Sequence, residues 1–162
     1  NNPEWQDGQP DPIDRWSYRV IWDLAQQIGA TPRFPFGPDA APFLTWAINS
    51  DAAWPSPVGM VVQAKAGLMV SYRGALVFDH EIHTEYHSRP CDTCAAPCLQ
   101  ACPVGALDGQ GYNVPACHSH LRSANGTDCT HGCLVRRACP ISQGYERDSA
   151  QSGYHMAQFV KS

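Results

Sequence analysis

The sequence predicts an α+β protein with a helical N-terminal part, a small antiparallel hairpin and a C-terminal cysteine-rich module. Three observations predict it. Apolar side chains recur at helical spacing over residues 13–28. Two runs rich in Val, Leu and aromatic residues flank a short turn between residues 58 and 78. All eight cysteines lie between Cys91 and Cys139, whereas residues 1–90 contain none. We therefore expect a scaffold over 1–88, a cysteine module over 89–142 and a C-terminal docking tail over 143–162.

The strongest helix signal covers residues 12–28. Asp11 suits the N-cap, Pro12 suits the first helical position, and Gly29 is a typical helix stop. The apolar stripe of this helix consists of Ile13, Trp16, Val20, Ile21, Leu24 and Ile28. This pattern predicts one amphipathic helix that begins at Pro12 and ends before Gly29.

The next segment alternates between loops and a short helix. Residues 30–42 hold four prolines and a glycine, so we expect a loop there. A second helix is expected over about 39–49, and residues 49–57 are expected to form another loop. All five tryptophans precede residue 55, which favours their packing in a core of the N-terminal part.

A β-hairpin is expected directly before the cysteine region. Residues 58–63 and 68–78 have the composition of strands, and residues 64–67 (AKAG) separate them as a turn. After Pro140, the aromatic side chains of residues 141–162 are sufficient to dock a last helix on the core.

Composition and charge exclude several classes of protein. Hydrophobic residues make up 43% of the chain, so it is not a disordered charged tail. The net charge is −4, and Lys and Arg are nowhere concentrated beyond Arg136 and Arg137, so we expect no nucleic-acid partner. No run of about 18 apolar residues occurs, so we expect no membrane partner. Residues 1–4 are polar and acidic, unlike a secretory signal peptide.

The cysteines form two runs that each end in Cys-Pro. Cys91, Cys94, Cys98 and Cys102 follow the pattern C-x2-C-x3-C-x3-C, and Pro103 follows the last of them. The second run is looser: Cys117 stands alone, and Cys129, Cys133 and Cys139 then lead to Pro140. Closely spaced sulfurs on a tight turn are typical of iron–sulfur ligands, and eight is the number that two four-iron clusters require.

Two other uses of these cysteines remain open. Zinc requires tetrahedral Cys and His sets, and His118, His120 or His131 could complete one, but only Cys91 and Cys94 form a strict C-x2-C pair. Zinc also leaves the two Cys-Pro endings unexplained. Disulfides would allow about a hundred pairings, and the spacing selects none of them. The seven histidines are His80, His83, His87, His118, His120, His131 and His155. We expect them to be polar loop residues rather than ligands. His131, inside the second run, is the main exception to test.

The first run resembles the bacterial ferredoxin run C-x2-C-x2-C-x3-C-P, with one more residue between its second and third cysteines. In that run three thiolates hold one cluster and the fourth holds the other. The resemblance therefore implies two [4Fe-4S] clusters as cofactors. Cluster 1 would be held by Cys91, Cys94, Cys98 and Cys139, and cluster 2 by Cys102, Cys117, Cys129 and Cys133.

The order of four cysteines, one cysteine and three cysteines is similar to the C-terminal half of the epoxyqueuosine reductase and reductive-dehalogenase-like group. In that group a ferredoxin module follows a nitroreductase-like cobalamin-binding domain. The resemblance covers residues 91–140 and extends less specifically over 56–90. Residues 1–50 show no such resemblance, and residues 1–88 are too few for a whole domain of that kind, so a truncated remnant is one interpretation of them. Asp51 is the one residue near the position of the group's catalytic acid, and we expect it to be an exposed loop residue, so no catalytic residue is predicted.

These features favour an iron–sulfur electron-transfer protein or electron-transfer subunit over an enzyme. Its partners would be redox proteins, and reduced thiolates with cubane clusters indicate a bacterial-type cytoplasm. One alternative is a shortened reductase that holds a corrinoid or flavin beside the clusters, although residues 36–39 lack the spacing of a phosphate-binding loop. The other is a structural zinc-binding module.

Overall fold

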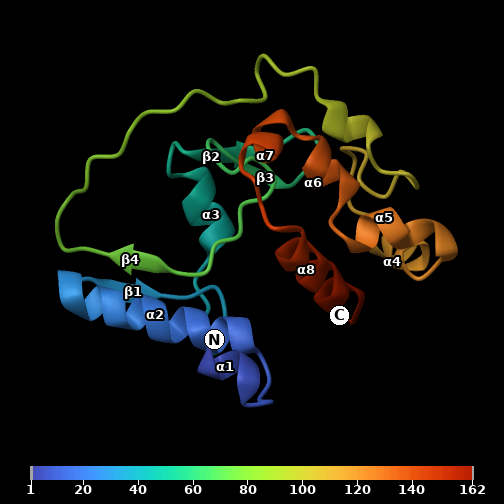
Figure 1. Cartoon of the computed structure of the whole chain (residues 1–162). Coiled ribbons are helices and arrows are strands. Elements are labelled where there is room, and N and C mark those ends of the chain that lie inside the picture. The colour runs from blue at the N-terminus through green and yellow to red at the C-terminus, as the bar shows by residue number, and fades with distance from the viewer. Residues whose placement is uncertain (1, 162) are drawn as a thin grey trace. The chain divides into compact units, whose positions relative to one another are not determined.

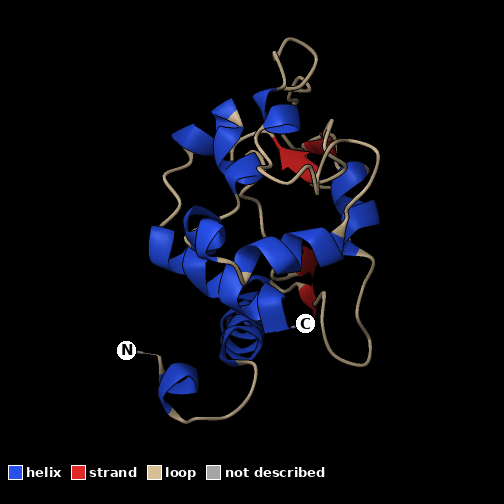
Figure 2. Cartoon of the chain, turned by 90° about the vertical axis from the view of Figure 1, so that its right-hand side faces the viewer, coloured by secondary structure: helices blue, strands red, loops and turns tan. Residues whose placement is uncertain are grey.

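The computed structural model describes residues 2–161 and has an α+β architecture. Helices alternate with two small antiparallel sheets of two strands each (Figures 1 and 2), so the α+β class is confirmed. The chain divides into two compact units: the first comprises residues 1–46 and 71–85, and the second comprises 47–70 and 86–162. The expected scaffold ended at residue 88, whereas residues 47–70 belong to the same unit as the cysteine region.

The first unit is built around one long helix. Its elements are α1 (Pro3–Gln6), α2 (Pro12–Ile28), β1 (Thr31–Arg33) and β4 (Ala75–Val77), and α3 (Phe43–Ile48) begins in it. β1 and β4 pair antiparallel beside α2, and Pro32 lies opposite Leu76 (Figure 1). The loop expected over residues 30–42 therefore contains a strand, and the helix expected over 39–49 is present but shorter.

The helix expected over residues 12–28 is confirmed, but its buried face is not the apolar stripe. Gly29 ends it with a left-handed φ of 68°, while Asp11 makes no side-chain capping bond. Ser17 and Ala25 are fully buried, whereas Trp16 is 36% exposed. Small side chains on this face let β1 and β4 approach the helix. Arg73 then ion-pairs with Asp14 and donates to the Ser17 hydroxyl at 3.2 Å.

The expected hairpin between residues 58–63 and 68–78 does not form. β3 (Val61–Gln63) instead pairs with β2 (Ala53–Pro55), a segment expected to be a loop, and β4 pairs with β1 in the first unit. The turn after Gln63 closes on itself, because the Gln63 side-chain oxygen accepts the N–H groups of Lys65 and Ala66, each at 2.7 Å. The chain then leaves the turn at Leu68, whose N–H donates to the hydroxyl of Ser142 at 2.9 Å.

Short helices dominate the rest of the second unit. They are η1 (Pro97–Gln100), α4 (Val114–Leu121), η2 (Ala124–Gly126), α5 (Thr127–Thr130), α6 (Leu134–Ala138), α7 (Pro140–Gly144) and α8 (Ser149–Lys161). Pro97 and Pro140 begin two of them, where the missing proline N–H costs nothing. α8 is the last helix expected from the sequence, and it packs against α5. None of the helices within residues 2–161 has the length and apolar character needed to cross a membrane.

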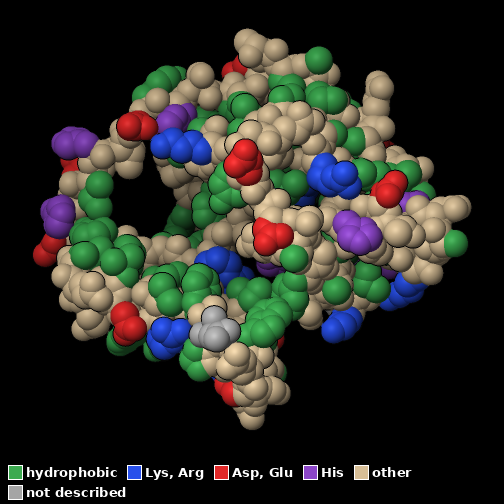
Figure 3. Space-filling view, in the orientation of Figure 1, with side chains coloured by type: hydrophobic (Ala, Val, Ile, Leu, Met, Phe, Trp, Pro, Cys, Tyr) green, Lys and Arg blue, Asp and Glu red, His purple; other side chains and the backbone are tan. Residues whose placement is uncertain are grey.

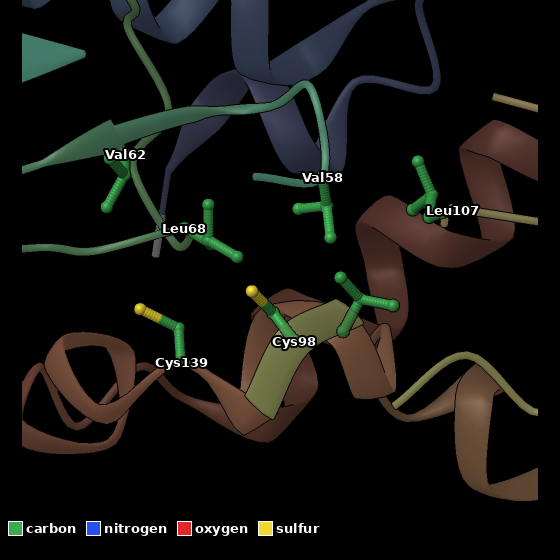
Figure 4. Close-up of a cluster of buried hydrophobic side chains, with 7 residues drawn as sticks. Val58, Val62, Leu68, Cys98, Leu107 and Cys139 are labelled. Atoms are coloured by element: carbon green, nitrogen blue, oxygen red, sulfur yellow. The ribbon is translucent and has the colours of Figure 1, made fainter. Parts of the chain in front are cut away.

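The hydrophobic core of the second unit contains cysteines. It consists of Val58, Val62, Leu68, Cys98, Leu107, Val135 and Cys139, and Figure 4 shows Cys98 and Cys139 on the side of the core opposite Val58 and Val62. Trp54 packs against this core, whereas the other four tryptophans are 36–57% exposed. The expectation that the tryptophans form the core of the N-terminal part is therefore wrong for these four. The residues that precede the cysteines instead contribute Val58, Val62 and Leu68 to a shared core.

Candidate metal centre

Four cysteines from distant parts of the chain line one cavity in the second unit. Cys91 and Cys94 lie in a turn before η1, and Cys98 is buried within η1. Cys139 is buried between α6 and α7, where its extended backbone ends one helix and begins the next. All four side chains line a cavity with Val62, Leu68 and Pro140. These are the four residues that the resemblance assigns to cluster 1.

A left-handed turn accommodates the three residues between Cys94 and Cys98. Ala96 has φ 52°, a conformation that costs a residue other than glycine about 1–2 kcal/mol. Its N–H donates to the Sγ atom of Cys94 at 3.4 Å, and Pro97 then begins η1. The extra residue relative to the ferredoxin run is thus absorbed in a turn that brings Cys94 and Cys98 to the same cavity.

The other four cysteines lie on the elements that follow η1. Cys102 comes directly after η1, and Cys117 is on α4. Cys129 is buried on α5, and Cys133 is the residue before α6. α4 begins with a capped end, because the Asn113 side chain accepts the N–H of Ala116 at 3.1 Å.

The thiols that affect the pKa of Cys91 and Cys98 belong to the same set of four as these two residues. Burial raises the pKa of the Cys91 thiol; nearby Arg89 opposes this, and Cys139, Cys94 and Cys98 raise the pKa further. Burial also raises the pKa of the Cys98 thiol, and Cys139 and Cys94 add to it. The neighbours of these two thiols are therefore all members of the first set.

In the second set, the thiols that affect the pKa of Cys129 and Cys117 also belong to that set. Burial raises the pKa of the Cys129 thiol, with further increases from Cys133, Cys102 and Cys117. Burial raises the pKa of Cys117 as well, and Cys133 and Cys102 add to it. The thiols that affect the pKa of Cys117 and Cys129 thus all belong to the set that the resemblance assigns to cluster 2.

Several hydrogen-bond donors surround the sulfurs. The N–H of Ala106 donates to the Sγ atom of Cys102 at 3.2 Å, and the Tyr112 hydroxyl donates to that of Cys117 at 3.4 Å. Ser56 lines the cavity of the first set, and its buried hydroxyl has no partner there. Thiolate ligands hold an iron–sulfur cluster, and N–H or O–H groups that donate to sulfur tune it, so these residues fit that group.

His80, His83 and His87 lie outside helices and strands, as expected, whereas His118, His120 and His155 lie on helices. His118 and His120 lie on α4, and the Nε2 atom of each is buried without a hydrogen-bond partner. His131 is exposed at the end of α5, with its Nδ1 atom 3.0 Å from the Thr127 carbonyl oxygen. Within residues 2–161, no three Cys, His, Asp or Glu side chains are arranged to hold a metal ion. In the same range all eight cysteines are free thiols.

Sequence reasoning missed Ser56 and Tyr112 as neighbours of the cysteines. Tyr112 is five residues before Cys117, but no sequence pattern predicts the hydrogen bond from its hydroxyl to the Cys117 sulfur. Ser56 is far from every cysteine in sequence and reaches the cavity only because β2 and β3 pair. Asp51 is an exposed turn residue with φ 54°, as expected, and it is not part of either set.

Charged side chains form no large patch of one sign on the face that Figure 3 shows, where Lys and Arg are scattered among neutral residues. Comparison with protein-family models, with curated proteins and with solved structures finds no match for this chain.

Proposed function

We propose that the protein is a cytoplasmic iron–sulfur electron-transfer protein whose second unit holds two [4Fe-4S] clusters in a ferredoxin-like module. Cys91, Cys94, Cys98 and Cys139 would hold one cluster. Cys102, Cys117, Cys129 and Cys133 would hold the other. The clusters would supply one-electron transfer between redox partner proteins.

One observation carries the proposal: Cys139 lines the same cavity as Cys91, Cys94 and Cys98, although about forty residues of chain separate it from them. Local spacing alone gathers three sulfurs, and the fold adds the fourth from the other Cys-Pro ending. This exchange between two runs is the arrangement that a two-cluster module requires.

The arrangement favours a cluster over a single zinc ion. Structural zinc sites often combine two C-x2-C pairs, whereas Cys91 and Cys94 are the one strict pair in this chain. In a cubane each thiolate binds a different iron, so the four sulfurs surround a larger object and lie farther apart. The N–H and O–H donors at Cys94, Cys102 and Cys117 would stabilise the charge on sulfur and help to set the reduction potential.

Anaerobic purification with iron and sulfide analysis tests the proposal. We expect iron and acid-labile sulfide in the amounts of two four-iron clusters, with visible absorption that dithionite bleaches. A colourless protein, or one that contains zinc in place of iron, would contradict it. Adding cobalamin or flavin to the same sample tests the reductase alternative, which predicts a spectral change.

Paired substitutions test the assignment of ligands. Cys98→Ala and Cys139→Ala should each remove one cluster, and the double variant should remove no more iron than either alone. Cys98→Ala combined with Cys129→Ala should remove both clusters. If Cys139→Ala spares both clusters, or if the first double variant loses both, the assignment is wrong.

A further inference from the structure

A second cavity in the same unit lies beside the two cysteine sets and is lined by basic side chains. It has a volume of about 580 Å³, within the usual size of small-molecule sites. Its apolar lining comes from Met69, Ala101, Leu134 and Ala138, and its polar lining includes Arg137, Gln143 and Arg147. Ala101 immediately precedes Cys102, and Ala138 immediately precedes Cys139, so the wall touches one ligand-bearing segment of each set.

Two arginines, Arg147 in the cavity lining and Arg136 outside it, donate to backbone carbonyls of the segment that contributes Met69. Arg147 donates from Nη1 to the Met69 carbonyl oxygen at 2.8 Å, and Arg136 donates from Nη1 to that of Leu68 at 2.8 Å. The Nε–H of Arg147 is buried and has no acceptor. That N–H has almost no exposed surface, so a ligand in the cavity would be held by the other N–H groups of the Arg147 guanidinium.

Positive charge exceeds negative charge here. Burial lowers the pKa of Arg147, and the positive charge of Arg136 lowers it further, while Tyr145 opposes these effects. Arg137 also lines the cavity, and Glu146 is the one carboxylate in the lining. Among residues 2–161, no ion pair joins Arg136, Arg137 or Arg147 to a carboxylate, so an anionic ligand would relieve this repulsion.

We propose that this cavity binds a small organic anion, with a carboxylate held by Arg147 and Arg137 and an apolar body packed on Met69, Ala101, Leu134 and Ala138. The inference goes beyond the proposed function, since it rests on protein side chains alone. A bidentate guanidinium–carboxylate contact gives orientation, and the apolar wall gives selectivity for an organic ligand over a simple ion.

Calorimetric titration of the anaerobically purified full chain with 2-naphthoate at low salt tests this site. We expect one binding event per chain, with affinity at least about tenfold weaker in Arg147→Gln, because a charge-assisted hydrogen bond is lost. The neutral analogue 2-naphthamide should bind more weakly than 2-naphthoate. Arg122→Gln is the matched control, since it removes the same charge from an exposed site on the same unit and should leave binding unchanged.

A second variant keeps the test decisive if Arg147→Gln destabilises the fold by releasing the Met69 carbonyl. Arg137 is exposed, and within residues 2–161 its side chain donates one long bond, at 3.4 Å to the Asp128 carbonyl, so Arg137→Gln should fold normally and still weaken naphthoate binding. The proposal is overturned if 2-naphthoate does not bind, or if it binds Arg137→Gln and Arg122→Gln equally. Inorganic phosphate binding as tightly as 2-naphthoate would overturn the role of the apolar wall.

Discussion

Ser142 accepts a hydrogen bond from the backbone N–H of Leu68 at 2.9 Å, and both residues are buried. Leu68 follows the turn at residues 64–67, and Ser142 lies on α7, just after the last cysteine. This bond and the neighbouring one from Arg136 to the Leu68 carbonyl attach residues 47–70 to the cysteine region.

Ser142→Ala should destabilise the second unit by about 1–3 kcal/mol, because it leaves the buried Leu68 N–H without an acceptor. Chemical denaturation of the anaerobic protein measures the change. Ser119→Ala, at an exposed position on α4, is the control and should have little effect. Equal stabilities for the two variants would show that the bond from Leu68 is not important for the fold.

Gly67→Ala should be at least as damaging, at about 1–3 kcal/mol. Gly67 has φ 57°, and a Cβ atom there would lie 2.5 Å from the backbone nitrogen of Ser142. Neither the backbone of α7 nor the turn has room to move away, since the Leu68 bond holds them together. Gly111→Ala, where a Cβ atom meets nothing within 4 Å, is the matched control in the same denaturation experiment. A Gly67→Ala variant as stable as Gly111→Ala would contradict this packing.

Removal of iron should unfold more than the cysteine region, if the proposed clusters are present. Cys98 and Cys139 belong to the same core as Val62 and Leu68, so loss of the cluster should also release β2 and β3. Hydrogen exchange after chelation and oxidation should show lost protection over residues 53–63 and 91–140. Protection of α2, in the first unit, should persist and serves as the internal control. Unchanged protection throughout the second unit would count against a cluster in its core.

Acid should loosen α1 from α2 through Glu4. Arg19 donates to the Glu4 carboxylate at 2.5 and 3.1 Å, and this hydrogen bonding lowers the pKa of Glu4 from its ordinary value of 4.5. A lowered folded-state pKa stabilises the fold above the ordinary value, and the stabilisation is lost as pH falls through the folded value. Hydrogen exchange of α1 should therefore quicken, relative to the intrinsic rate, as pH falls below about 4.5.

Glu4→Gln should reduce that acid response, whereas Asp39→Asn, at an exposed position, should leave it intact. Part of the response should remain in Glu4→Gln, because Arg15 also lowers the pKa of Asp7 by a hydrogen bond. An acid response identical in Glu4→Gln and the unmodified protein would rule out the Glu4–Arg19 pair as its source.

Reduction should weaken binding at the cavity lined by Arg137 and Arg147, a prediction that rests on both proposals. An electron added to either cluster places negative charge near the bound carboxylate, which should lower the affinity for 2-naphthoate about two- to tenfold. Titrations before and after dithionite reduction measure this. Equal affinity in both redox states would show that the cluster charge does not affect the cavity. The titration of the oxidised protein would then remain the test of the binding site itself.

Local patterns predicted the helix over residues 12–28 and the short helix near Phe43, because proline, glycine and apolar spacing act within a few residues. They did not predict the buried face of α2, which consists of Ser17 and Ala25, whereas Trp16 is exposed. Where another backbone packs closely against a helix, only small side chains fit between them. The spacing of apolar residues along the sequence does not indicate where such close packing occurs.

The sequence by itself determined the chemistry that this chain carries: eight thiols in two runs that each end in Cys-Pro. Only the tertiary structure decided which segments meet. Strands of three residues have too little pattern to specify a partner. The pairing of β3 with β2 and of β4 with β1 therefore could not be predicted from the sequence. The neighbours of the sulfurs, such as Ser56, were likewise set by contacts between residues distant in the chain, since such contacts depend on the complete fold rather than on local spacing.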